Sequence, residues 1–155
     1  MRIATQKDLD SIVSIYNSTI FDRTATADLE PVSVESKLDW FRNHDPNTRP
    51  ILVYENNDIV EAWVSFQSFY GRPAYAGTAE ISIYIKPECR GRGLGKTLLA
   101  QSLDMTPRLG IKTVLGFIFS HNQASLKLFQ SFEFDIWGKL PDIASMDGTD
   151  YSLFI

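Results

Sequence analysis

The 155-residue sequence has little of what marks several large classes of protein. Its single cysteine, Cys89, excludes an internal disulfide, and no residues are clustered at metal-ligand spacing. No apolar run approaches the ~20 residues that span a bilayer, and the first residues lack the apolar segment of a secretion signal. We therefore expect a cytoplasmic protein without a metal and without a membrane partner.

An excess of positive charge is also missing. Lys and Arg number 15 against 19 Asp and Glu, giving a net charge of −4, which argues against nucleic-acid binding because phosphate contacts need clustered cations. The one dense basic cluster, Arg90, Arg92 and Lys96, lies among glycines and suits a compact phosphate group better than a long polyanion. The hydrophobic content of 44% is typical of one globular domain, here over residues 1–155.

Hydrophobic periodicity predicts helices and strands along the whole chain. Helices are expected from about Leu9 to Tyr16, over Val34–Asn43 with Ser33 as N-cap, from Leu94 onward, and over Ala124–Ser131. Strands are expected at 1–5, 51–54, 59–69, 79–85, 113–119, 134–139 and 151–155, with the last two closing the sheet. Because several strands follow one another directly, the predicted class is α+β (mixed α/β), with a largely antiparallel mixed sheet and one parallel strand–helix–strand unit.

The segment Arg90–Lys96 (RGRGLGK) joins an expected strand to a leucine-rich helix. Glycines let the backbone approach a ligand closely, and the N–H groups that begin a helix lack intrahelical partners and meet the positive end of the helix dipole. Such a turn binds a pyrophosphate, and its three basic residues add charge. The alternative is a tight strand–helix turn without a ligand.

The glycine spacing separates three phosphate-binding patterns. Gly91, Gly93 and Gly95 are two residues apart, which does not fit the dinucleotide pattern G-x-G-x-x-G. The P-loop pattern would need a glycine where Arg90 stands. The remaining pattern, R-x-x-G-x-G, is satisfied by Arg90, Gly93 and Gly95 and resembles the acyl-CoA pyrophosphate loop of the GNAT acetyltransferase superfamily.

A second stretch makes the resemblance more specific. Arg72–Ile85 (RPAYAGTAEISIYI) is similar to the R-x-A-Y-x-x-T-x-E-x-[ST]-[VI]-Y-[VI] stretch of phosphinothricin and methionine sulfoximine acetyltransferases. The order of expected elements also matches the superfamily over essentially the whole chain. The resemblance implies a GNAT acyl-CoA N-acyltransferase fold, splayed at the cofactor site and flanked by helices, with acetyl-CoA as co-substrate.

The resemblance also implies which residues hold acetyl-CoA. The pyrophosphate would lie on Arg90, Gly91, Arg92, Gly93, Leu94, Gly95 and Lys96. Ile83, Tyr84 and Ile85 match a strand whose backbone N–H groups face the thioester oxygen and the pantetheine amides. Asn122 matches an asparagine that contacts the pantetheine arm, with Ser125 as a weaker candidate; the alternative is that Asn122 only caps the next helix.

The reaction implied is acetyl transfer to the amine of a small amino acid or analogue such as phosphinothricin, methionine sulfoximine or methionine sulfone. Glu80 matches the proposed general base, although its alternation with isoleucines also fits a carboxylate facing solvent. Arg72, with Tyr75 beside it, is the expected acceptor-binding residue, or else a solvated loop charge. Other functions stay open: acetylation of a protein N-terminus or a polyamine, or a non-catalytic acyl-CoA-binding module. A homodimer is expected, since related enzymes are often dimers.

The C-terminal region departs from the phosphinothricin pattern. Those enzymes usually carry G-[WF]-K-H-G-x-W-x-D, whereas this chain has Trp137–Asp142 (WGKLPD) and then Met146–Asp150 (MDGTD). The sequence ends at Ile155 within an expected strand, so either the chain is truncated or its acceptor site is built differently. The general acid also stays open, because Phe129 lies in the region where many GNAT enzymes have a tyrosine.

Overall fold

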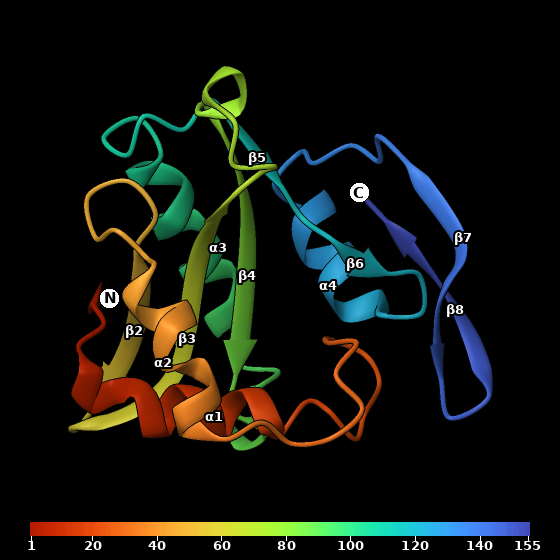
Figure 1. Cartoon of the computed structure of the whole chain (residues 1–155), viewed down its shortest axis with the longest axis horizontal. Coiled ribbons are helices and arrows are strands. Elements are labelled where there is room, and N and C mark those ends of the chain that lie inside the picture. Colours follow the sequence, from red (N-terminus) through yellow and green to blue (C-terminus); the bar gives the residue numbers. More distant parts are fainter.

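The computed structural model describes residues 1–155, and a β-hairpin in the middle of the chain organises its sheet (Figure 1). Asn57 and Asp58 adopt φ angles of 49° and 61°, which short polar residues tolerate, and they form the predicted turn between β2 and β3. The sheet order is β1-β2-β3-β4-β5, with strands at Arg2–Ile3, Ile51–Asn56, Ile59–Ser68, Thr78–Ile85 and Thr113–Leu115. The pairs β1–β2, β2–β3 and β3–β4 are antiparallel.

The parallel pair β4–β5 is short, and this opens the sheet. The two strands pair over three residues, from Thr78 opposite Thr113 to Glu80 opposite Leu115. Beyond Glu80, β4 continues to Ile85 without a strand on that side, because the chain turns away after β5. The connection runs through α3 (Leu94–Met105), so the predicted strand–helix–strand unit and the splayed sheet are both confirmed.

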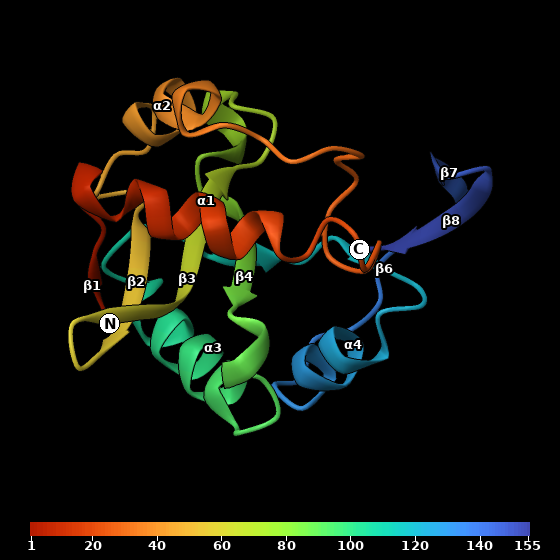
Figure 2. The same ribbon diagram turned by 90° about the horizontal axis from the view of Figure 1, so that it is seen from below.

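Helices cover both faces of the sheet, as Figure 2 shows. Helices α1 (Leu9–Asn17) and α2 (Val34–Arg42) lie on one face, and α3 lies on the other beside α4 (Gln123–Gln130). The predicted cap is present, since the Ser33 hydroxyl accepts from the Ser36 N–H at 3.2 Å. None of these helices combines the length and the apolar character that crossing a bilayer requires.

Two clusters of buried side chains decide which way the residues of β4 face. Ile81 packs into the cluster under α3, with Phe66 and Leu98. The alternate residues of a strand point to the opposite face, so Glu80, Ser82 and Tyr84 face α1 and α2. The sheet thus presents the candidate base to the α1–α2 layer.

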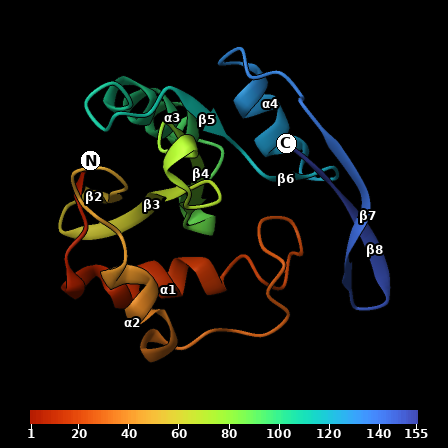
Figure 3. The ribbon, with the colours of Figure 1, turned by 45° about the horizontal axis from the view of Figure 1, so that its top comes forward.

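The C-terminal strands differ from the predictions. The strand expected at 113–119 is two strands, β5 and β6 (Ile118–Phe119), and residues 134–138 form no strand at all. Instead β7 (Lys139–Met146) and β8 (Thr149–Phe154) form a hairpin around Asp147 and Gly148, whose φ angles are 53° and 78°. This hairpin does not close the main sheet: it forms a separate sheet, β6-β8-β7, that projects from the rest of the molecule (Figure 3).

Candidate active site

The glycine-rich turn before α3 presents a row of unpartnered N–H groups. Gly91 and Gly93 have φ angles of 73° and 82°, in the left-handed region that favours glycine. The N–H groups of Gly91, Arg92 and Gly93 donate to no acceptor in the protein, and those of Leu94 and Gly95 begin the helix. Together with the positive end of the α3 dipole, these groups form an anion-binding site.

The side chains of the turn have different roles. Arg90 turns back on the protein, with Nε donating to the Ile85 carbonyl at 3.0 Å and Nη1 lying 3.4 Å from Asp22 Oδ2. Arg92 and Lys96 are exposed and form no ion pair, so they are the cations free to meet a phosphate.

Gly95 serves packing instead of turn geometry. A Cβ at this position would lie 3.2 Å from Leu128 Cδ2 on α4 and 3.6 Å from Ile85 Cδ1 on β4. Glycine therefore lets the first turn of α3 approach both α4 and the open edge of β4, which brings the anion site next to that edge.

The open edge of β4 carries backbone donors on alternate residues. The Lys86 N–H donates to the Glu61 carbonyl, so the even-numbered residues of β4 exchange hydrogen bonds with β3. Ile83 and Ile85 consequently direct their N–H groups toward the side that β5 leaves open, whereas the Tyr84 N–H is directed toward β3. Of the three residues predicted on this strand, two place donors at the open edge.

Glu80 lies in a cavity of about 270 Å³ between the sheet and helices α1 and α2. Its walls include four aromatic side chains, one further charged group and three polar ones: Tyr16, Trp40, Trp63, Tyr84, Lys37, Ser65, Gln67 and Ser82. Trp63 stacks on Tyr84 with ring centroids 4.4 Å apart, so the two rings form one continuous aromatic wall. Glu80 is half-buried and faces the cavity, in contrast to the alternative of a carboxylate in open solvent.

Burial sets the protonation states in the cavity. It raises the pKa of Glu80 above the ordinary carboxyl value of 4.5, with the Ser82 hydroxyl partly opposing the shift. Burial and the hydrogen bond donated to Asp28 Oδ2 raise the pKa of Tyr16 to about 12. The pKa of Tyr84 is also raised by burial, so Glu80 is the group here that can accept a proton near neutral pH.

Glu80 is expected to lower the stability of the folded protein at neutral pH. Below the unfolded-state pKa the carboxyl is protonated in both states; above it, the unfolded state ionises first and stability falls until pH passes the higher folded-state pKa. Glu80→Gln should therefore match the wild-type melting temperature at about pH 4 and exceed it at about pH 8. Thermal melts of both proteins between these pH values test this expectation. It is contradicted if the melting temperature of the wild type rises relative to that of the variant as pH increases.

Asn122 is fully engaged within the protein. Its Oδ1 accepts from the Ser125 N–H at 3.0 Å, which makes it the N-cap of α4, and its Nδ2 donates to the Thr24 carbonyl at 2.9 Å. The second bond holds the segment after α1, and the His121 ring adds a 2.7 Å bond to the Arg23 carbonyl. The capping role is thus present, while contact of Asn122 or Ser125 with a cofactor stays a prediction.

Asn122→Ala is expected to destabilise the protein by about 1–2 kcal/mol, because α4 loses its cap and the Thr24 carbonyl loses its donor. Asn122→Asp retains a capping oxygen and loses only the Nδ2 donor, so it should destabilise the protein less than Asn122→Ala does. Urea unfolding of the three proteins measures both effects. An alanine variant as stable as wild type would show that the cap contributes nothing.

The residues predicted to bind the acceptor lie elsewhere. Arg72 and Tyr75 are exposed in the connection between β3 and β4, and neither lines the Glu80 cavity. Arg72 forms no ion pair, which agrees with the alternative that it is a solvated loop charge. Tyr75 packs edge-on against Phe69. The charged residue that the cavity does contain, Lys37, was not singled out from the sequence.

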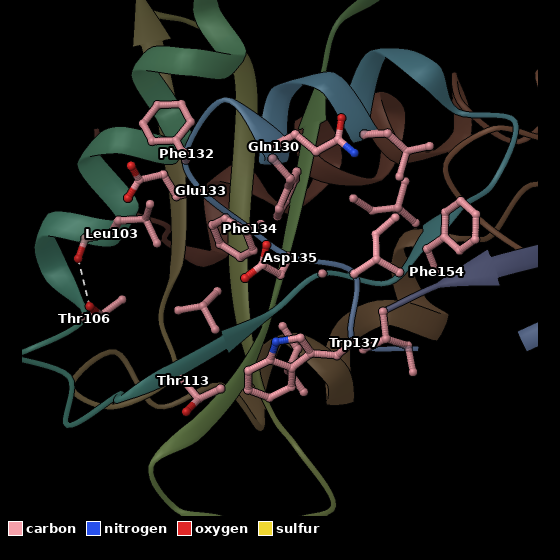
Figure 4. Close-up of a pocket in the computed structure, with 18 of the residues that line it drawn as sticks. Leu103, Thr106, Thr113, Gln130, Phe132, Glu133, Phe134, Asp135, Trp137 and Phe154 are labelled. Atoms are coloured by element: carbon pink, nitrogen blue, oxygen red, sulfur yellow. Dashed lines mark hydrogen bonds between the residues drawn. The ribbon is translucent and has the colours of Figure 1, made fainter. Parts of the chain in front are cut away.

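A larger cavity of about 440 Å³ lies on the other side of β5 (Figure 4). Aromatic side chains line much of it, including Phe134 and Phe154, and the indole of Trp137 is 73% exposed at its rim. None of the residues predicted for catalysis or binding lines this cavity. The predicted base, Glu80, lines the smaller cavity instead.

Known proteins share this arrangement. Residues 11–134 match the model of the acetyltransferase (GNAT) family. A Bacillus subtilis (strain 168) protein named "Putative phosphinothricin acetyltransferase YwnH" is 51% identical over all of this chain and 95% of its own length. The Salmonella typhimurium L-methionine sulfoximine/L-methionine sulfone acetyltransferase is 29% identical over 92% of this chain and 84% of its own.

A solved structure agrees in the fold. The crystal structure of a GNAT superfamily phosphinothricin acetyltransferase from Sinorhizobium meliloti, in complex with acetyl-CoA, is 27% identical and superimposes with a TM-score of 0.91. The match covers 99% of this chain and 83% of that one. The strand order, the splay after Glu80 and the glycine-rich turn, together with these matches, show that the chain belongs to the GNAT family of acetyltransferases.

Proposed function

We propose that the protein transfers the acetyl group of acetyl-CoA to the amino group of a small amino acid or analogue, of the phosphinothricin, methionine sulfoximine or methionine sulfone type. The observation that carries this proposal is the position of Glu80. It is the last residue of the β4–β5 pair, and it lines the cavity under α1 and α2 at the point where the two strands separate. A base at this position would have the amine acceptor on one side, in the cavity. On its other side it would have acetyl-CoA, in the gap between β4 and β5.

The anion-binding turn before α3 and the open edge of β4 support the binding of acetyl-CoA, the acetyl donor. The N–H groups of Gly91 to Gly95, with Arg92 and Lys96, would hold the pyrophosphate, which the helix dipole favours. The pantetheine arm would then run along β4, where Ile83 and Ile85 offer N–H groups. A backbone donor aimed at the thioester oxygen stabilises the negative charge that develops during attack, typically by a few kcal/mol.

The acceptor side is supported by the Glu80 cavity. Glu80, with its raised pKa, accepts a proton from the substrate ammonium, directly or through water, so that the neutral amine can attack the thioester carbon. The C–N bond forms and the C–S bond breaks, and the attacking nitrogen then loses its second proton. That proton replaces, directly or by way of water, the one that the departing thiolate takes from water or from Tyr84, which burial keeps protonated. Holding both reactants together supplies a further share of the rate.

The alternative acceptors fit the cavity less well. A polyamine needs several carboxylates, yet Glu80 is the single carboxylate among the lining residues and Lys37 adds a positive charge. A protein N-terminus needs an open groove, whereas this cavity has a volume of about 270 Å³ and is walled by α1 and α2. A non-catalytic acyl-CoA-binding module has no use for a half-buried base that faces such a cavity.

The direct test is thiol release from acetyl-CoA over a panel of acceptors: free amino acids, methionine sulfone, methionine sulfoximine, phosphinothricin, polyamines and short peptides. Turnover with the amino acids or their analogues is expected. Turnover with polyamines or peptides alone would replace the proposed acceptor. Tight acetyl-CoA binding without turnover of any acceptor would favour the non-catalytic module.

The expected homodimer is also a proposal. Ile136, Trp137 and Ile143 are at least half exposed and lie on or next to the projecting hairpin, where a second copy would cover them. Light scattering on the eluting protein measures the mass directly, and a monomer at micromolar concentration would contradict this part. The cytoplasmic location predicted from the sequence stays a prediction.

A further inference from the structure

The Glu80 cavity contains a second charged group that the proposed reaction does not use. Lys37 on α2 is half-buried, and its ammonium lies 4.7 Å from the ring centroid of Tyr16 and 5.9 Å from that of Trp40. Attraction between a cation and the face of an aromatic ring holds such an ammonium in place. The charge is therefore fixed at the cavity wall by α1 and α2.

Lys37 has no protein partner for its charge. The structure contains four ion pairs, and neither Lys37 nor Glu80 takes part in any of them. Asp28, whose carboxylate accepts a hydrogen bond from the Tyr16 hydroxyl, forms no ion pair with Lys37 either. The three N–H donors of the ammonium consequently have no acceptor in the protein, although a partly buried ammonium is stabilised by one.

The cavity thus holds one cation and one carboxylate that are not paired with each other. A zwitterionic amino acid presents the complementary pair, an ammonium and a carboxylate on the same carbon. Its ammonium would meet Glu80 and its carboxylate Lys37, which satisfies both protein groups at once. An amine without a carboxylate leaves the Lys37 charge without a partner and places two positive charges in one cavity.

We propose that Lys37 binds the α-carboxylate of the acceptor and so selects free amino acids over other amines; this inference rests on the proposed function. The aromatic walls then pack around the rest of the acceptor. Arg72, which the sequence indicated for this role, lies outside the cavity lining. Lys37 is a specificity-determining residue in the acceptor half of the site, and the acetyl-CoA half does not involve it.

The test compares one acceptor in two forms, the free acid and its primary carboxamide, which has the same side chain but no negative charge. In Lys37→Met, kcat/KM for the acid should fall by at least about 30-fold, mostly through KM, while the value for the carboxamide changes by less than about 3-fold. Lys37→Arg keeps the charge and should keep most of the preference for the acid. The KM for acetyl-CoA should not change in either variant.

Lys7→Met is the matched control, since Lys7 is exposed in the turn before α1 and lines neither cavity. If kcat/KM of Lys37→Met falls equally for the acid and the carboxamide, the variant has only a structural defect, and this overturns the inference. So does a wild type that acetylates carboxamides as well as acids, while the proposed function stands. A wild type that acetylates no amino acid overturns the proposed function itself, and the inference with it.

Discussion

Glu80→Gln is expected to lower kcat/KM for the acceptor by about 10²–10⁴ at neutral pH, the usual contribution of a positioned general base. Glutamine keeps the size of the side chain but cannot accept the proton of the substrate ammonium. The affinity for acetyl-CoA should stay within about 3-fold of wild type, because the anion site and the open edge of β4 do not involve this side chain.

The pH profile separates a base from a residue that only shapes the cavity. Burial raises the pKa of Glu80 above 4.5, so kcat/KM of the wild type should rise with pH through an inflection above that value as the carboxyl ionises. The glutamine variant should lose this inflection. Glu35→Gln is the control, since Glu35 lies exposed on α2 and does not line the cavity. Full activity of Glu80→Gln at every pH would remove Glu80 from the mechanism.

Gly93→Trp is expected to weaken acetyl-CoA binding by at least about 100-fold, the effect of losing about two charge-assisted hydrogen bonds. A φ of 82° strains any side-chain-bearing residue, so the turn would shift and its N–H groups would no longer converge. No protein atom lies within 4 Å of the position of a new Cβ, so a steric clash with the rest of the protein is not the expected cause of the loss.

Gly110→Trp is the matched control for this prediction. Gly110 lies beyond the C-terminal end of α3 with a φ of 69° and equally open surroundings, so the substitution carries a similar backbone penalty far from the anion site. Calorimetric titration with acetyl-CoA should show normal binding for Gly110→Trp and very weak binding for Gly93→Trp. Normal binding in both variants would mean that the pyrophosphate lies elsewhere.

The cofactor half of the site was the more predictable half, because it depends on local signals. The glycine spacing, the helix start at Leu94 and the strand before the turn are neighbours in sequence, so their relative geometry follows from turn and helix rules. The same rules indicated Asn122 as an N-cap. What local rules did not predict is that Arg90 turns away from the anion site toward Asp22, a residue far away in the sequence.

The acceptor half depends on packing between distant segments. The alternation along β4 predicted that Glu80 and the neighbouring isoleucines face opposite sides of the sheet. It did not predict that helices cover the side that Glu80 faces. Lys37 and Trp40 are three residues apart, so the sequence already indicates that they share one face of α2. Only the packing of that helix over Tyr16, however, places the Lys37 ammonium at the cavity. The strand expected at 134–139 also depended on distant segments. Its C-terminal end pairs with the end of the chain, where Gly138 and Ile155 exchange backbone hydrogen bonds, while residues 134–137 form no strand.

The central claim is that the acetyl group passes directly from acetyl-CoA at the open edge of β4 to an amine beside Glu80. Initial rates with both substrates varied, together with the mass of the intact protein after incubation with acetyl-CoA alone, test this most directly. Direct transfer predicts intersecting double-reciprocal lines, an unmodified protein and a product acetylated on its amino nitrogen. Parallel lines with an acetylated protein, for example on the buried thiol of Cys89, would contradict it.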